Sequence, residues 1–177
     1  MDPIAAENFK NFQLDVAALP NYEAVQLEPI SRKYLIKLQV GTGVSLLFLV
    51  VGFAVGYYFV PEEFKNYLIG AIVLMLALFL WTFFNNIMYV KRSGYALREQ
   101  DIIFKRGFLF EKTTVVPFNR IQHVSVERSF LDKVLNIATL KIFTAGGSGS
   151  DINIPGIKPG IAGTLKEEIS ERIFRHA

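Results

Sequence analysis

Two long runs of uncharged, mainly apolar residues dominate the first half of the chain. Leu38 to Val60 contains no charged residue over 23 positions, and Tyr67 to Val90 contains none over 24. A helix of about 20 apolar residues is long enough to cross the hydrocarbon core of a bilayer. The pattern therefore predicts two transmembrane helices, at about 38–60 and 67–90.

The link between the two runs is only six residues long, 61-PEEFKN-66. So short a link predicts an antiparallel helical hairpin, and Pro61 is expected to end the first helix. Ser31 stands where a helix N-cap belongs, so the hairpin is assigned residues 31–90. Residues 1–30 carry five acidic side chains against one lysine and are predicted to form an acidic cytoplasmic tail.

Beyond Tyr89 the apolar pattern changes, and segments rich in Val, Ile, Phe and Thr alternate with turn residues. Strands are predicted at 93–98, 101–107, 109–116, 120–128, 138–144 and 151–155. From about Pro159 the period becomes helical, with apolar residues at Ile161, Leu165, Ile169 and Ile173. Residues 91–177 are therefore predicted to form a cytoplasmic domain, a small barrel of mostly antiparallel strands capped by a C-terminal helix.

The strand predicted at 120–128 has a mixed pattern. Strict alternation places Gln122, Val124 and Val126 on one face and Ile121 on the other. This assignment predicts which side chains of the strand reach the core.

Positive charges flank the hairpin on one side of the membrane. Three basic residues precede the first span and three follow the second: Arg32, Lys33, Lys37, Lys91, Arg92 and Arg98. The turn holds Lys65 alone, beside two glutamates. Since positively charged flanks stay in the cytoplasm, we expect an inner-membrane protein with two spans and both termini cytoplasmic.

Small residues recur at four-residue spacing in the first span, as Gly41 and Ser45 and as Gly52 and Gly56. This spacing allows membrane helices to approach closely. Two partners stay open at this point, the second span of the same hairpin and a second copy of the chain. Gly52 and Gly56 are therefore candidate helix-packing residues.

The side chains that carry chemistry in enzymes form no recognised pattern. The chain has no cysteine, which excludes disulfides and thiol catalysis. Ser148 lies in a Gly-Gly-Ser-Gly-Ser segment that misses the GxSxG elbow of serine hydrolases, and the same loop lacks the Gly-Lys-Ser/Thr ending of a P-loop. A flexible hairpin loop is predicted there instead.

The remaining polar residues fit structural roles. His123 and His176 are 53 positions apart without a metal-binding cluster, so His123 is predicted to lie on a strand face with a local hydrogen bond. Glu127, Asp132 and Asp151 stand at turn or strand-end positions. Neither span holds an acidic residue, which would mark a transport path. The chain is therefore predicted not to be an enzyme, with no metal, no cofactor and no identified small-molecule substrate.

Several motifs of the second half resemble one known family. They are Arg106-Gly107-Phe108-Leu109, Thr114-Val115-Val116-Pro117-Phe118-Asn119-Arg120-Ile121-Gln122-His123-Val124, Leu135-Asn136-Ile137-Ala138-Thr139-Leu140, Thr144-Ala145-Gly146-Gly147 and Ile154-Pro155-Gly156. Over about residues 93–175 their order and spacing resemble the bacterial pleckstrin-homology domain of the membrane-flanked, YdbS-like type, and the preceding hairpin matches that family's layout. The resemblance implies a pleckstrin-homology-like barrel, no established catalytic chemistry, and assembly with a larger relative that has several such domains.

Charge differs between the two halves of the chain. Residues 91–177 hold 14 basic and 9 acidic side chains, net +5, whereas residues 1–90 hold 5 and 7, net −2. An anionic membrane surface attracts a nearby basic residue by about 1 kcal/mol. The candidate membrane-surface contacts are Lys91, Arg92, Arg98, Lys105 and Arg106. Lys105 and Arg106 are adjacent and leave opposite faces of a strand, so the alternating basic pattern of eukaryotic phosphoinositide pockets is absent.

Two functions remain open. The first is an interaction or scaffold subunit of a membrane complex, whose protein partner is a larger protein with related domains or a second copy of the chain. The second is binding of anionic lipid headgroups at the cytoplasmic leaflet. Nucleic acid is not an expected partner, because basic and acidic residues are interleaved. The acidic tail is expected to pack on this domain or on a partner's equivalent domain, because their charges are opposite.

Overall fold

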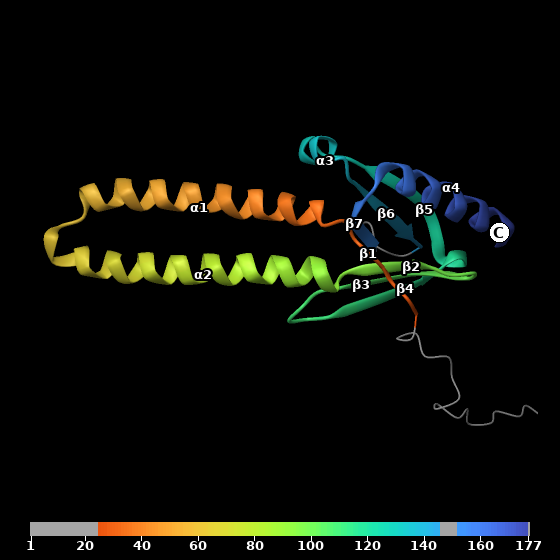
Figure 1. Ribbon diagram of the computed structural model, residues 1–177, viewed down its shortest axis with the longest axis horizontal. Helices are drawn as coiled ribbons and strands as arrows, with labels where there is room; N and C mark the ends of the chain where they lie inside the picture. Colours follow the sequence, from red (N-terminus) through yellow and green to blue (C-terminus); the bar gives the residue numbers. More distant parts are fainter. Residues whose placement is uncertain (1–24, 146–151, 177) are drawn as a thin grey trace, which may run out of the picture.

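The computed structural model describes residues 25–145 and 152–176 and shows a long helical hairpin with strands at its open end (Figure 1). The tail before residue 25 lies outside the described residues. So does the predicted loop with Ser148 and Asp151. The strands and the remaining helices gather into one domain beyond the hairpin, so the molecule is elongated.

The hairpin consists of α1 (Lys33–Phe59) and α2 (Lys65–Arg92), joined by the 3₁₀ helix η3 (Glu62–Phe64). Each helix is long and apolar enough to cross a membrane, and none of the apolar window of either is buried inside the chain. As predicted, the first helix stops just before Pro61. It starts slightly later than expected, with Arg32 as its N-cap, while the Ser31 hydroxyl accepts a 3.3 Å hydrogen bond from the Lys33 N–H. Ser31 therefore still serves the first turn, and the boundary differs by one residue.

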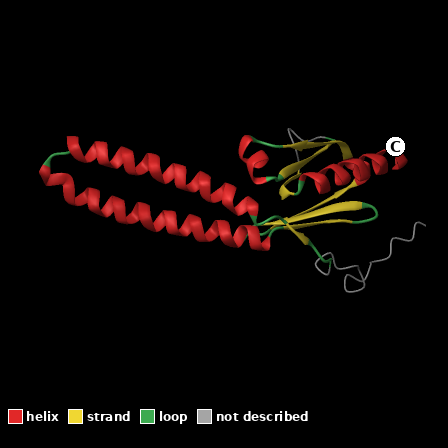
Figure 2. Ribbon diagram, turned by 45° about the horizontal axis from the view of Figure 1, so that its top comes forward, coloured by secondary structure: helices red, strands yellow, loops and turns green. Residues whose placement is uncertain are grey.

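The described strands form two antiparallel sheets (Figure 2), with the orders β1-β2-β3-β4 and β5-β6-β7. Their bounds are Glu28–Pro29 for β1, Gly94–Leu97 for β2, Asp101–Arg106 for β3, Lys112–Pro117 for β4, Ile121–Glu127 for β5, Ala138–Thr144 for β6 and Ile152–Ile157 for β7. The 3₁₀ helix η4 (Phe118–Arg120) links the sheets, α3 (Phe130–Leu135) bridges β5 and β6, and α4 (Pro159–His176) follows β7.

The two sheets do not close into the predicted barrel. Within the described part of the chain, no hydrogen-bonded strand pair joins one sheet to the other. β4 ends at Pro117, which has no N–H to donate, and η4 then turns the chain into the second sheet. The fold class is nevertheless as predicted: two membrane helices, antiparallel pleckstrin-homology-like sheets and a C-terminal helix.

β1 precedes the hairpin in sequence but pairs with β2, which follows the hairpin. Glu28 lies opposite Tyr95, and Pro29 lies opposite Gly94. The strands approach so closely that a Cβ on Gly94 would lie 3.0 Å from the Glu28 carbonyl oxygen. Residues 28–29 stand at the end of the predicted acidic tail, yet they belong to the first sheet. The hairpin is thus inserted between two paired strands, and both helices leave the domain from neighbouring points (Figure 1).

The core lies between the two sheets and α4. Its fully buried side chains include Ile102, Phe104, Phe118, Leu140, Ile142, Ile154, Ala162 and Ile169. In the predicted stripe of the last helix, Ile169 is fully buried and Leu165 and Ile173 pack on the core, but Ile161 is 42% exposed. Ala162 takes its place because the buried face follows the 3.6-residue period rather than a strict period of four.

A β-bulge in β5 overturns the predicted strand faces. The register with β6 shifts between Ile121 and His123, which leaves Gln122 without a Cα partner. Gln122 is exposed, while Ile121 and Val124 are both buried. The prediction that Gln122 shares a face with Val124 is therefore wrong, since one extra residue flips the faces on one side of it.

Candidate functional site at the junction of hairpin and domain

One ion pair joins the hairpin to the domain across 95 positions of sequence. Lys37, near the start of α1, donates from Nζ to both carboxylate oxygens of Asp132 in α3, at 2.8 and 2.9 Å. The Asp132 side chain is only 4% exposed, and that of Lys37 is 27% exposed. α1 and α3 therefore meet at a charged contact that is largely shielded from solvent.

Asp132 also forms hydrogen bonds with Ser129, the N-cap residue of α3. The Ser129 hydroxyl accepts from the Asp132 N–H, and Asp132 accepts from the Ser129 N–H at 2.9 Å, which is a capping box. Burial by itself would raise the pKa of Asp132, but hydrogen bonds from Lys37 and Ser129 outweigh it and hold the pKa below its ordinary value. Asp132 therefore carries a negative charge at neutral pH.

Backbone contacts secure the start of α1 against the domain. The Ser31 N–H donates to the Gly156 carbonyl at 2.8 Å, and the Ile30 N–H donates to the Ser93 carbonyl at 3.3 Å. Gly156 has a φ of 71°, and a Cβ there would lie 2.8 Å from the Cβ of Tyr34. Glycine is required at this position because both the backbone angle and the approach of α1 disfavour a side chain.

The contact between β1 and β2 also includes side chains. The Tyr95 hydroxyl donates to the Glu28 carboxylate at 3.2 Å. Burial, and next to it the charge of Glu28, raises the pKa of Tyr95 to about 12. The phenol therefore stays protonated and remains a donor at physiological pH.

The five predicted membrane-surface cations lie in two places. The end of β2 that follows α2 brings together Lys91, Arg92, Lys105 and Arg106. Gly94 starts this strand and pairs with Lys105, which fixes the arrangement. Arg98 lies beyond the opposite end of β2, where its Nε donates to Asp101 at 2.6 Å. The structure therefore separates Arg98 from the other four.

The four cations near α2 differ in their partners. Glu111 pairs with Lys105 at 3.0 Å and with Arg92 at 3.1 Å. Hydrogen bonds from Lys105 and then from Arg92 lower the pKa of this carboxyl. Arg106 lies over the Phe104 ring, 5.9 Å from its centroid, and has no carboxylate partner among the described residues. Exposed Lys91 likewise has none there.

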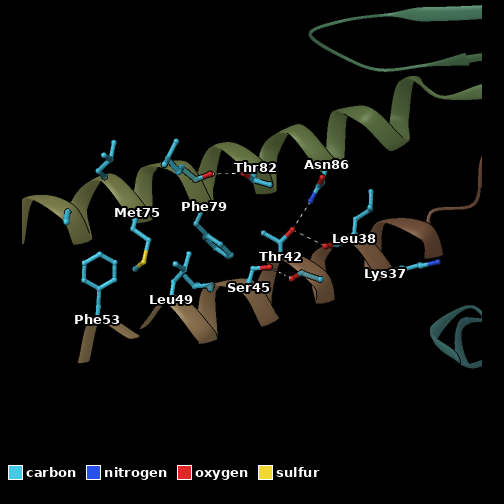
Figure 3. Close-up of a pocket in the computed structure, with 15 residues that line it drawn as sticks. Lys37, Leu38, Thr42, Ser45, Leu49, Phe53, Met75, Phe79, Thr82 and Asn86 are labelled. Atoms are coloured by element: carbon cyan, nitrogen blue, oxygen red, sulfur yellow. Dashed lines mark hydrogen bonds between the residues drawn. The ribbon is translucent and has the colours of Figure 1, made fainter. Parts of the chain in front are cut away.

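A groove of about 760 Å³ runs between α1 and α2 (Figure 3). Apart from leucines and phenylalanines, its lining includes Lys37, Gly41, Thr42, Ser45, Ala71, Met75, Thr82 and Asn86. Two polar bridges cross between the helices toward the domain. Asn86 Nδ2 donates to Thr42 Oγ1 at 3.0 Å, and Gln39 Nε2 donates to the Phe83 carbonyl at 3.2 Å. The hairpin is therefore tied together near its base and leaves an apolar groove farther along.

The predicted packing residues Gly52 and Gly56 do not contact α2 closely. A Cβ built on either would meet no atom within 4 Å. The second span of the same hairpin is therefore not their close partner. Packing of these glycines against a second copy of the chain stays a prediction.

The residues weighed for chemistry have structural partners. His123 stacks on Phe143 with ring centroids 4.1 Å apart, and Glu127 pairs with Lys141 at 2.6 Å. Asp132 is not an ordinary exposed turn residue, because it is buried and paired. Across residues 25–145 and 152–176, no group of three His, Cys, Asp or Glu side chains is placed to hold a metal ion.

The role of Asp132 is the main feature that sequence reasoning missed. Its only local signal is the spacing of Ser129 and Asp132, which fits a capping box and so predicts a helix start. In the sequence, Lys37 indicates only the orientation of the hairpin in the membrane. A pair formed across the whole hairpin leaves no local pattern that identifies its two members.

Two membrane helices joined to a two-sheet domain with a C-terminal helix define a membrane-anchored protein of the pleckstrin-homology-like class. The sequence model of the bacterial PH domain family matches residues 38–173 of this chain. The chain therefore belongs to that family. The match includes most of α1 and all of α2 as well as nearly all of the domain that follows.

The chain is similar to the UPF0699 transmembrane protein YdbS of Bacillus subtilis (strain 168). The two are 28% identical over 129 residues, which cover 73% of this chain and 79% of that relative. No solved structure matches the chain. The predicted YdbS-like family and the membrane location are confirmed, and the family is not a known enzyme family.

Proposed function

We propose that this chain is a non-enzymatic interaction subunit of a membrane complex, and that its hairpin packs against a transmembrane helix of a protein partner. One observation carries the proposal: α1 and α2 contain five glycines at which a Cβ would meet nothing within 4 Å, Gly41, Gly43, Gly52, Gly56 and Gly70. Glycine weakens a helix by roughly 0.5–1 kcal/mol relative to alanine, and its benefit in membranes is the close approach of another helix.

The groove between α1 and α2 supports the same role. Its hydroxyl groups are already satisfied by their own helix, since Thr42 donates to the Leu38 carbonyl at 2.9 Å and Ser45 to the Gly41 carbonyl at 3.0 Å. A partner helix therefore needs an apolar face of complementary shape rather than a matching polar group.

The proposed partner is a larger membrane protein with related domains or a second copy of this chain. The resemblance to the membrane-flanked family favours the larger protein. The small residues of α1 favour a second copy, because the same residues on two copies could pack against each other. The proposed location is the bacterial inner membrane, with both termini in the cytoplasm, because basic residues flank the open end of the hairpin. The domain would then meet the partner's cytoplasmic part beside the same membrane.

Affinity purification of the full-length protein from native membranes in mild detergent tests the proposal. We expect a membrane protein to copurify in a fixed ratio. Replacing Gly52 and Gly56 by leucine should release it, because the larger side chains block close approach. The matched control replaces Val51 and Val55, which are 53% and 55% exposed on the same helix, by leucine and should retain the partner.

Two results would contradict this function. One is a preparation that contains only this chain as a monomer. The other is equal retention of the partner by the glycine and valine variants, which would move the contact away from the hairpin.

A second candidate function is binding of anionic lipid headgroups at the cytoplasmic leaflet. It is favoured by the net charge of +5 over residues 91–177 and by the position of four of the predicted cations at the end of the domain that adjoins α2. A preparation without a protein partner but enriched in anionic lipid would favour this candidate.

A further inference from the structure

The loop between β3 and β4 exposes apolar side chains beside the membrane helix. Phe110 is 85% exposed and Leu109 is 62% exposed. The loop extends back along the end of α2 (Figure 1), and Phe108 meets Phe84 of that helix edge to face, with ring centroids 5.9 Å apart. Because this apolar loop tip lies beside a membrane-spanning helix, the lipid around that helix is a favourable environment for its exposed side chains.

The contact with Phe84 sets the depth of the loop. The uncharged run of α2, Tyr67–Val90, is about 36 Å long at 1.5 Å per residue, whereas the hydrocarbon core is about 30 Å thick. Any placement that keeps the core within this run puts Phe84 inside the hydrocarbon, near its cytoplasmic boundary. Phe108 shares that depth because its ring contacts Phe84.

Two cations face each other at the base of the same loop. Arg106 lies directly opposite Lys112 in the β3–β4 ladder. Directly opposite residues of antiparallel strands point to the same face, where like charges repel. Neither side chain has a carboxylate partner among the described residues, since Glu111 is taken by Lys105 and Arg92. An anion between Arg106 and Lys112 would relieve this repulsion.

A pocket of about 400 Å³ connects these cations with the membrane helix. It is lined by Trp81, Asn85 and Tyr89 of α2, by Arg106 and Lys112, and by the loop residues from Gly107 to Phe110. Tyr89, near the cytoplasmic end of α2, is typical of headgroup depth, whereas Trp81 lies three residues deeper in the hydrocarbon than Phe84. The pocket therefore has an apolar side at the bilayer and a cationic side at the domain.

We propose that the β3–β4 loop inserts Leu109 and Phe110 into the cytoplasmic leaflet and that Arg106 and Lys112 bind the phosphate of one anionic phospholipid in this pocket. The proposal rests on the second candidate function and gives it a site. It retains Arg106 among the predicted contacts, adds Lys112, and leaves Arg98 out.

The only tryptophan of the chain, Trp81, lies in the pocket and is 56% exposed, so it serves as the probe. Full-length protein is placed in nanodiscs of phosphatidylcholine with a fixed minor fraction of brominated phosphatidylglycerol or brominated phosphatidylcholine. Bromine quenches tryptophan at short range, so the ratio of quenching reports the preference for the anionic lipid beside Trp81. We expect a preference of about 30-fold, as two basic contacts of about 1 kcal/mol each would give.

Variants separate the site from general surface charge. Arg106→Gln with Lys112→Gln should reduce the preference to near unity. The matched pair Lys33→Gln with Lys133→Gln removes the same charge from exposed positions in α1 and α3 and should leave the preference unchanged. A preference that persists without Arg106 and Lys112 would overturn the site while leaving anionic-lipid binding standing. A wild-type protein without any preference would overturn both.

Free phosphate is distinguished from lipid in the same assay. Replacing chloride by inorganic phosphate at equal ionic strength should not change the quenching. Loss of the preference in phosphate buffer would show that the site takes the free anion, against the proposal.

Insertion of the loop is measured separately with single spin labels. These can be attached at one chosen position because the chain has no cysteine of its own. A spin label at Phe110→Cys should be accessible to oxygen in the bilayer and protected from an aqueous nickel complex. The control label at Phe174→Cys, on an α4 residue that is 83% exposed, should show the opposite. Equal nickel accessibility at both positions would overturn insertion.

Discussion

The ion pair between Lys37 and Asp132 attaches α1 to the domain through a largely buried carboxylate. A carboxylate that is 4% exposed has lost most of its hydration, and the lysine and the capping box replace it. Removing one member of a buried pair is more damaging than never having had the pair, because the remaining charge stays buried without compensation.

Substitutions of this pair should show strong coupling. We expect Asp132→Ala, which removes both the ion pair and the helix cap, to lower the free energy of unfolding by about 2–4 kcal/mol. Lys37→Met should cost about 1–3 kcal/mol because the buried carboxylate remains. The double variant should cost less than the sum of the two. Chemical denaturation of the full-length protein in detergent micelles measures these values.

The pair of Lys65 with Glu62 in the hairpin turn is the control, because its carboxylate is 87% exposed whereas that of Asp132 is 4% exposed. Glu62→Gln should leave the free energy of unfolding nearly unchanged, since a solvated carboxylate gains little from an ion pair. Strictly additive losses at Lys37 and Asp132 would contradict a direct interaction between them.

Acid should weaken the same junction. The folded-state pKa of Asp132 lies below its unfolded value, so its stabilisation is complete above about pH 4 and is lost as the pH falls through the folded pKa. We expect the wild-type protein to lose more stability than Asp132→Asn between about pH 4 and the folded pKa. Denaturation curves recorded at several acidic pH values compare the two, and parallel pH profiles would refute the assignment.

Among the elements, the two-residue strand β1 joins the segment before the hairpin to the domain after it. It ties the chain before the hairpin to β2 behind it, and its Glu28 accepts from the buried Tyr95. The domain is consequently not continuous in sequence, and residues 91–177 alone lack one strand of the first sheet.

Truncation separates β1 from the residues before it. Deletion of residues 2–24 retains the strand, whereas deletion of residues 2–29 removes it. We expect the longer deletion to lower the free energy of unfolding by about 1–3 kcal/mol more than the shorter one, because it breaks ladder hydrogen bonds and leaves the Tyr95 hydroxyl without its acceptor. Denaturation of both truncated proteins tests this, and identical curves would show that β1 is dispensable.

For the molecule as a whole, the insertion of the hairpin between paired strands places both helix ends at one side of the domain. Both helices must then leave the membrane on the same side. This geometry agrees with the distribution of positive charge, although the two arguments are independent.

Labelling of single cysteines tests the proposed orientation, because the natural chain has none. Glu63 lies in the hairpin turn, and Lys166 is an exposed residue of α4. Each is replaced by cysteine in a separate variant. An impermeant maleimide should label only position 63 in right-side-out vesicles and only position 166 in inverted ones. Detergent-solubilised protein, in which both should react, is the control. The reversed pattern would place the domain outside the cytoplasm.

The sequence by itself determined the elements whose signals are local. The lengths of the uncharged runs predicted both spans, Pro61 marked the end of the first helix, and a change of period marked the strands and the last helix. Motif order also identified the family. These inferences succeeded because length, period and motif spacing are properties of contiguous residues.

Only the tertiary structure decided which distant residues meet. It paired Lys37 with Asp132, joined Glu28–Pro29 to β2, and brought Phe108 against Phe84. It also placed a bulge at Gln122, and this single irregularity reversed a face that strict alternation had assigned. Burial and charge compensation at these contacts depend on groups from separate parts of the chain, so no single segment of the sequence contains enough information to predict them.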